Sequence, residues 1–146
     1  MSSVMSFSEY YEILVKKTNE IRKELEDIIV CDVDDIPFLD EIKDMDCRYR
    51  AYAKVAKNSV KVSQLLSNCH FTKDAVIRVK HKLQKDTTSP PKLLTSWLRD
   101  TDCLIQELDG ILLSAKCYKE GLDNLNRFYQ SACYMFGSIV EVKTPI

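Results

Sequence analysis

The sequence predicts an all-α protein, in which a long antiparallel helical hairpin and an N-terminal helix form a three- or four-helix bundle with coiled-coil character. Two observations lead to this fold class. Apolar residues recur at alternating steps of three and four over long stretches, which is the 3.5-residue period of a helix seam. The 146 residues include only three glycines and four prolines, so few turns interrupt the helices. The length suits a single helical domain over residues 1–146.

The first helix is expected over residues 7–30. Ser6 and Glu9 stand three residues apart, which is the spacing of a capping box at a helix start. Pro37 and the aspartates before it end the pattern. The expected seam consists of Phe7, Tyr11, Leu14, Thr18, Ile21, Leu25 and Ile28.

The middle of the chain is expected to form either two helices, over residues 37–69 and 72–86, or one bent helix. The segment NCHFT at 68–72 would be the break, with Thr72 as a cap, but it contains no Gly or Pro. The expected seam also slips its register at Val60. It runs through Phe38, Ile42, Met45, Tyr49, Tyr52 and Ala56, then through Val60 and Val62 to Leu66 and Cys69, and continues with Val76, Val79 and Leu83.

The last helix is expected over residues 91–140, after the turn TTSPP at 87–91, in which Ser89 is the expected N-cap and Pro90 the first helical residue. The matched lengths on both sides of this turn predict the hairpin. We expect the first helix to fold back along the hairpin's open end. The seam is regular throughout: Leu94, Trp97, Thr101, Leu104, Leu108, Ile111, Ala115, Tyr118, Leu122, Leu125, Tyr129, Ala132, Phe136 and Ile139.

In the first half of this last helix, a third position beside the two seam positions is also apolar. An apolar face of that width fits a bundle rather than a single partner helix. Because only two helices are expected near the turn, two explanations stay open. Either residues 72–86 fold back and cover the face, or another chain covers it. Under the second explanation the protein interface consists of Leu98, Ile105 and Leu112, helped by Val76, Val79 and Leu83.

Charge is strongly segregated along the chain. Residues 24–46 hold ten acids and one base, and residues 47–85 hold ten bases and one acid, although the net charge is only −1. The bases are either a solvated helix face or an electrostatic contact surface for an acidic protein, an anionic membrane or nucleic acid. Missing interleaved aromatics and a pI of about 6.1 disfavour nucleic acid. Two rows recur at helical spacing: Arg50, Lys54, Lys57 and Lys61, and then Arg78, Lys82 and Lys85.

We expect no catalytic site, metal or cofactor, and hence no enzyme. The six cysteines form no C-x-x-C pair and are read as free thiols. His70 and His81 lie outside the seams, and the phosphate-loop, dinucleotide-binding and H-E-x-x-H motifs are missing.

The function expected from these features is a non-enzymatic interaction or assembly subunit, or adaptor, that associates through its heptad-patterned helices with itself or with helical partners. The alternative is a compact four-helix regulatory protein that binds an acidic protein surface or nucleic acid through the Lys/Arg rows. With no apolar run long enough to span a membrane and no leader pattern, we expect a cytoplasmic or nuclear location. The sequence does not choose the partner, the process or the oligomeric state.

Overall fold

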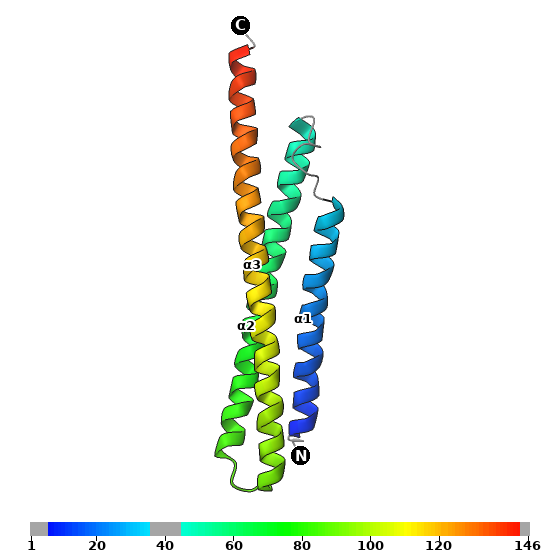
Figure 1. The fold of residues 1–146 in the computed structure, drawn as a ribbon, viewed down its shortest axis with the longest axis vertical. Coiled ribbons are helices and arrows are strands. Elements are labelled where there is room, and N and C mark those ends of the chain that lie inside the picture. The colour runs from blue at the N-terminus through cyan, green and yellow to red at the C-terminus, as the bar shows by residue number, and fades with distance from the viewer. Residues whose placement is uncertain (1–5, 36–44, 144–146) are drawn as a thin grey trace, which may run out of the picture. The chain divides into compact units, whose positions relative to one another are not determined.

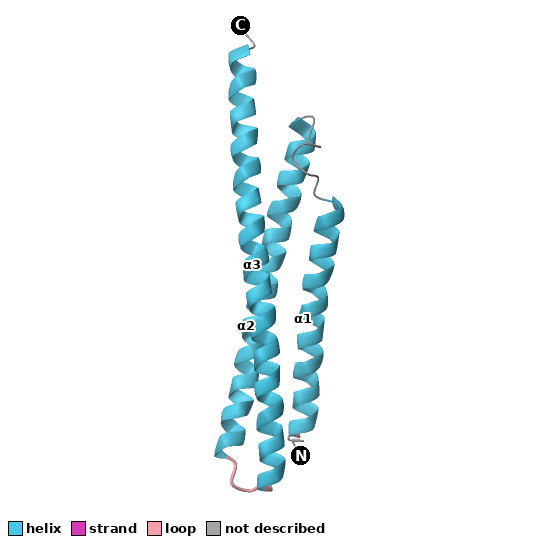
Figure 2. Ribbon diagram, in the orientation of Figure 1, coloured by secondary structure: helices cyan, strands magenta, loops and turns pink. Residues whose placement is uncertain are grey.

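The computed structural model describes the backbone of residues 6–35 and 45–143, and the side chains of 6–32, 46 and 48–130. Within these residues the structure is all-α, with three helices: α1 (Phe7–Asp35), α2 (Met45–Lys85) and α3 (Pro91–Lys143) (Figures 1 and 2). The predicted fold class is confirmed, because α2 and α3 pack together as a hairpin and α1 is a third helix with fewer contacts.

Local hydrogen bonds explain where the helices begin. The hydroxyl of Ser6 accepts the amide of Glu9 at 3.3 Å, as the capping-box spacing predicts. In the turn before α3, the Asp86 carboxylate accepts the amides of Thr88 and Ser89 at 2.7 and 3.1 Å, and also both hydroxyls. Ser89 is therefore a donor to Asp86 rather than the predicted N-cap, and α3 begins at Pro91.

The middle of the chain forms one helix, so the single-helix alternative is the observed one over 45–85. α2 is helical throughout 68–72, and Thr72 donates its hydroxyl to the carbonyl of Asn68 at 2.8 Å instead of capping a new helix. The predicted helical start at 37–44 lies outside the described residues. The seam of α2 keeps its register without a slip, and its inward residues are Ala51, Val55, Asn58, Val62, Leu65, Cys69, Thr72, Val76, Val79 and Leu83.

The predicted seams of α1 and α3 are confirmed over the described side chains. In α1 the seam positions from Leu14 to Leu25 are buried, and the flanking ones are half-buried. In α3 every seam position from Leu94 to Tyr129 is buried or half-buried. The predicted seam residues after position 130 lie outside the described side chains.

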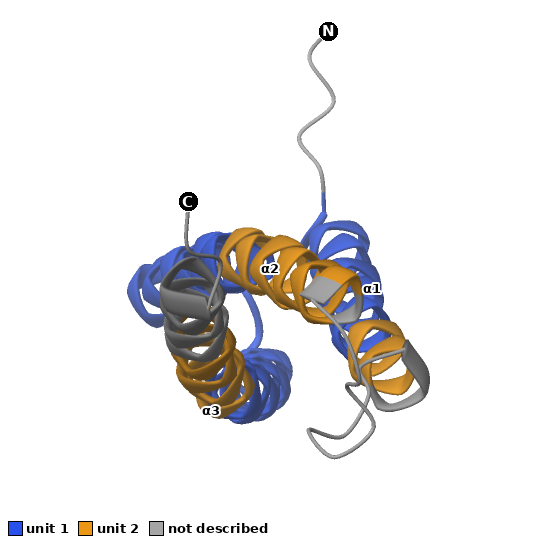
Figure 3. Ribbon diagram, turned by 90° about the horizontal axis from the view of Figure 1, so that it is seen from above, with its two compact units in different colours: residues 1–25, 65–115 blue, residues 26–64, 116–146 orange. Residues whose placement is uncertain are grey.

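Contacts divide the chain into two compact units (Figure 3). Unit 1 contains Met1–Leu25 and Leu65–Ala115, and unit 2 contains Glu26–Gln64 and Lys116–Ile146. Each unit holds a part of all three helices. The expectation of a single domain stays a prediction.

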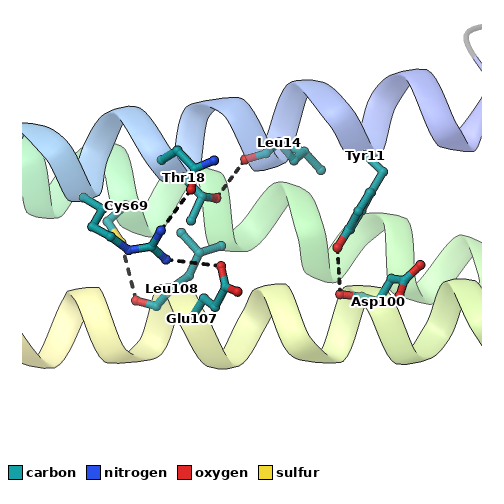
Figure 4. Close-up of polar contacts among 9 residues, drawn as sticks. Tyr11, Leu14, Thr18, Cys69, Asp100, Glu107 and Leu108 are labelled. Atoms are coloured by element: carbon teal, nitrogen blue, oxygen red, sulfur yellow. Dashed lines mark hydrogen bonds and ion pairs between the residues drawn. The ribbon is translucent and has the colours of Figure 1, made fainter.

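Unit 1 shows the direction of its helices through contacts between them. The ring of Phe7 lies 4.8 Å from that of Trp97, and the hydroxyl of Tyr11 donates to the carbonyl of Asp100 at 3.3 Å (Figure 4). Further along both helices, Arg22 pairs with Glu107 at 3.2 Å, so α1 runs parallel to α3 here. The ion pairs Lys73–Asp109 and Lys80–Asp102 show that α2 runs antiparallel to α3.

Candidate functional site

The apolar face that we expected near the hairpin turn belongs largely to the core of unit 1. Val76, Leu83 and Leu112 are buried, at 0%, 7% and 6% exposure. Leu98, Ile105 and Val79 are half-buried. Val76, Leu83 and Leu112 therefore need no partner chain to cover them, while an interface role for the three half-buried residues stays a prediction.

The reason for this difference is the position of α1, which we expected along the open end of the hairpin. Instead, its N-terminal half packs beside the first half of α3, as the contacts of Phe7 and Tyr11 show. Three helices are therefore present where two were expected, so neither a fold-back of residues 72–86 nor another chain is needed to bury Val76, Leu83 and Leu112. Periodicity could not predict the direction of α1, because a seam indicates which side of a helix is buried but not the direction in which the helix runs.

The two predicted basic rows lie on the surface of α2. Arg50, Lys57 and Lys61 are exposed in unit 2, and Lys54 is half-buried beside them. In unit 1 the second row, Arg78, Lys82 and Lys85, is also exposed. The electrostatic role of both rows stays a prediction.

An apolar stripe in unit 2 lies on the side of α2 that faces away from the core. We call Tyr49, Ala53, Ala56 and Val60 the outward stripe. Tyr49 and Val60 are 53% and 59% exposed, Ala53 is exposed and Ala56 half-buried. Relative to the buried seam positions 51, 55, 58 and 62 the stripe is displaced by two residues, which is about 200° around a helix. Sequence analysis placed Tyr49, Ala56 and Val60 in the expected seam, which was wrong for this side of α2, and did not single out Ala53.

A polar cluster joins the three helices within unit 2. The buried carboxylate of Asp32 accepts hydrogen bonds from the amide of Asn58 and the hydroxyl of Tyr118. Burial raises the pKa of Tyr118, and the hydrogen bond to Asp32 and its negative charge raise it further. Tyr118 is therefore held as a neutral donor, and the cluster connects α1, α2 and α3 through hydrogen bonds. Sequence analysis missed it, because its members come from three helices.

A second polar contact in unit 2 is centred on Asp123. Its carboxylate accepts the hydroxyl of Ser59 at 2.6 Å and pairs with Lys119 at 2.7 Å. The hydrogen bond from Lys119 lowers the pKa of Asp123, and that from Ser59 lowers it further. These groups are mutually satisfied, so they offer no free acid or base.

The described cysteines, Cys31, Cys69, Cys103 and Cys117, are free thiols, as predicted, while Cys47 and Cys133 lie outside the described side chains. Cys69 is buried and donates to the carbonyl of Leu108 at 3.5 Å (Figure 4). Burial raises its pKa to about 11, with a further increase from Asp109 that Lys73 partly offsets. A thiol in this state is a poor nucleophile.

In the described part of the chain, no group of three His, Cys, Asp or Glu side chains gathers in a way that could hold a metal ion. Two surface hollows lie in unit 1, one of about 520 Å³ along α1 and one of about 240 Å³ between α1 and α2. The smaller one brings Phe71 close to Lys17, Glu20 and Glu24.

No protein-family model, characterised protein or solved structure matches this chain. What its own fold defines is a class: a three-helix protein built on an α2–α3 hairpin. Among the described helices, none has a stretch long and apolar enough to cross a membrane.

Proposed function

We propose that this chain is a non-enzymatic interaction or assembly subunit, which associates with other proteins through a helical surface. The observation that supports this proposal is the outward stripe, because α2 is apolar on two opposite sides and, in the part of the chain that the structure describes, only one of them is buried. Single exposed apolar residues are normal on protein surfaces, but a row at heptad spacing is the pattern of a helix seam.

The energetic reason is the cost of leaving such a row in water. Burying a side chain such as that of Val60 is worth roughly 1.5–3 kcal/mol. Tyr49 adds an aromatic ring, and aromatic residues are enriched where proteins meet. A partner that covers the outward stripe therefore stabilises the complex through burial of apolar surface that stays exposed in the isolated chain.

The alternative, binding of an acidic surface or nucleic acid through the basic rows, has one observation in its favour. Arg50, Lys57 and Lys61 are all exposed and follow one another along α2. The row directly borders the outward stripe, however, and an apolar border contributes little to contacts with phosphates, which depend on charge. The four-helix form of this alternative is not the observed fold.

The proposal is tested by the size of the native species. In a gentle extract of the cells that express the protein, we expect it to migrate well above the 16.9 kDa of one chain, both before and after nuclease treatment. Sedimentation of the purified chain shows whether this size needs other proteins. A chain that is monomeric both in the extract and after purification contradicts the proposal, and loss of the large species on nuclease treatment favours the nucleic-acid alternative.

A further inference from the structure

We propose that the outward stripe of α2 docks an acidic amphipathic helix of a partner protein. This inference rests on the proposed function and adds the site, the secondary structure of the partner and its charge.

The geometry of the outward stripe fits a helix. Its residues follow one another at steps of four, three and four, so that they stay on one side of α2 over about 16 Å. Anchors at this spacing are the pattern by which one amphipathic helix packs on another. A peptide that binds as an added β-strand, by contrast, needs a sheet edge, and no strand is present among the described residues.

The sizes of the side chains suggest how the partner helix would lie. Ala53 and Ala56 are small and stand between the larger Tyr49 and Val60. Small residues at the centre of a contact permit the short end of the 8–10 Å range of helix–helix distances. A partner helix with large aliphatic residues would place them over the two alanines, with Tyr49 and Val60 enclosing the ends.

The charge beside the stripe suggests the sign of the partner. Arg50, Lys57 and Lys61 each directly follow a residue of the outward stripe, and all three are exposed. They therefore form one basic edge. The opposite edge carries a half-buried Tyr52 and a buried Ser59, which donates to Asp123 of α3, with a half-buried Arg48 at its start. Glutamates or aspartates on the flank of a partner helix would meet the basic edge, which favours and orients the encounter.

The same edge disfavours a second copy of α2 as the occupant. In a two-fold antiparallel pair of identical helices, each edge lies next to the same edge of the other helix. Arg50, Lys57 and Lys61 would then face a second set of like charges. In a parallel pair they would instead meet the opposite edge, whose Arg48, Tyr52 and Ser59 include no acid. Charge therefore favours neither arrangement, and we assign the surface to a different chain.

The test uses two synthetic helices, each stapled to keep it helical and labelled with fluorescein. Both carry leucines along one seam. One has glutamates beside the seam, and the other has lysines at the same positions. Fluorescence anisotropy with the full chain at moderate salt measures the binding of each. We expect the glutamate helix to bind about tenfold more tightly than the lysine helix, and its affinity to fall as salt rises.

Two variants and their matched controls locate the binding. Val60→Glu places a charge in the outward stripe and should weaken binding of the glutamate helix about tenfold or more. Its control is Val30→Glu, because Val30 is an equally exposed valine of unit 2, at 61% against 59%, on α1. Lys57→Glu with Lys61→Glu should also weaken binding, whereas Lys82→Glu with Lys85→Glu makes the same charge change in the second basic row and should not. Circular dichroism confirms that all variants fold.

Several outcomes overturn the inference. These are equal binding of the two helices, equal effects of Val60→Glu and Val30→Glu, tighter binding of a duplex oligonucleotide through Lys57 and Lys61, or a homodimer that Val60→Glu dissociates. The native complex separates this inference from the proposed function. If Val60→Glu leaves a large native species unchanged, the function stands and this site is wrong. If the wild-type chain has no large species, the proposed function fails, whatever the synthetic helices do.

Discussion

Polar residues occupy seam positions in all three helices, and they are satisfied in two ways. Thr18 donates its hydroxyl to the carbonyl of Leu14 at 2.7 Å, and Thr101 to that of Leu98 at 2.8 Å, so these threonines need no partner from another helix. Asn58 is different, because its amide donates to Asp32 of α1. A buried polar contact between helices is satisfied in one register only, and polar seam residues fix register in coiled coils in this way.

Replacement of Asp32 tests this at the residue scale. Asp32→Ala leaves the buried amide of Asn58 without its acceptor and also removes the acceptor of Tyr118. We expect the free energy of unfolding to fall by about 2–3 kcal/mol, because two donors lose the hydrogen bonds that they make to one carboxylate. Urea titration followed by circular dichroism measures it. Val30→Ala, two residues away and exposed, should cost less than about 0.5 kcal/mol. A similar loss in both variants would show that the cluster contributes nothing specific.

The thiol of Cys69 gives a second prediction at this scale. Because its folded-state pKa is raised to about 11, Cys69 stays protonated at pH 8, and the surrounding core excludes reagents. We expect iodoacetamide to modify the exposed Cys31, Cys103 and Cys117 long before Cys69, as followed peptide by peptide with mass spectrometry. In denaturant the difference should vanish. Modification of Cys69 at the rate of Cys103 in the native protein would contradict its burial.

At the scale of the helices, the sequence predicted the seams of α1 and α3 but not that of α2. The predicted seam positions of α1 and α3 hold apolar residues or threonine, so one period describes each helix. The end of α1 was predicted wrongly: the helix runs to Asp35 rather than to residue 30, because the buried Asp32 continues the seam among aspartates that were interpreted as a helix end. The seam of α2 contains Asn58 and Thr72, while its opposite side carries Tyr49, Ala53, Ala56 and Val60. The apolar pattern therefore moves from one side to the other, which resembles a slip of register. Only the packing of α1 and α3 decides which side is buried.

The candidate site was less predictable than the fold for the same reason. The residues expected at an interface, such as Val76 and Leu112, are apolar because they are core. Three residues of the outward stripe, Tyr49, Ala56 and Val60, were found by the period but interpreted as core, and Ala53 was not singled out. Periodicity identifies a helix face that avoids water, and it does not distinguish a face covered by the same chain from one left for another chain.

The turn between α2 and α3 makes the free energy of unfolding depend on pH, with lower stability at lower pH. The hydrogen bond from the hydroxyl of Ser89, followed by those from Thr88, lowers the pKa of Asp86 from 3.8 to about 2. The folded state therefore favours the charged carboxylate. Its contribution is complete above pH 3.8 and is lost as the pH falls toward 2.

Asp86→Asn tests this contribution. We expect the difference in the free energy of unfolding between wild type and Asp86→Asn to be constant from pH 7 to 5 and to shrink between pH 4 and 2. Comparing the two proteins at each pH removes the effect of the other acids. Ser89→Ala removes the hydrogen bond that lowers the pKa of Asp86 most. In a Ser89→Ala background, the Asp86→Asn substitution should therefore change the free energy of unfolding by only part of the amount seen in the wild-type background. A difference that does not change with pH would show that the Asp86 hydrogen bonds do not form in solution.

For the whole molecule, the acidic block at residues 24–46 and the basic block at residues 47–85 contribute more to encounters with partners than to stability. Lys73 and Lys80 pair with Asp109 and Asp102, but the acids are about half exposed. Exposed pairs of this kind contribute roughly 0–1 kcal/mol each. The blocks of opposite sign can instead orient an approaching charged partner, an effect that salt screens within about 8–10 Å. This supports the choice of an acidic partner for the basic edge.

The two units differ in what their cores are made of. Among the described side chains, thirteen of 71 in unit 1 and five of 40 in unit 2 are buried apolar residues. Unit 1 buries large aliphatic residues such as Leu104, Leu108 and Ile111. Each unit also buries three polar residues. Those of unit 1, Thr18, Thr72 and Thr101, bond to carbonyls of their own helices, whereas those of unit 2, Asp32, Asn58 and Ser59, bond to residues of another helix. Local opening free energies follow the apolar area that opening exposes, so the described part of unit 2 should open more easily.

Hydrogen exchange followed by mass spectrometry measures this difference within one sample. We expect the amides of 46–64 and 116–130 to exchange at a lower free energy of opening than those of 65–85 and 91–115. Leu108→Ala, which makes a cavity in the core of unit 1 at a cost of about 2–5 kcal/mol, should reduce the gap, whereas Asp32→Ala should widen it. Leu113→Ala, at an exposed position of the same helix, is the control and should change neither unit. Equal exchange in both units, with equal responses to all three variants, would mean that the chain opens as one cooperative structure. In that case the polar cluster would stabilise the whole molecule, and the outward stripe would lie on a surface as rigid as the rest.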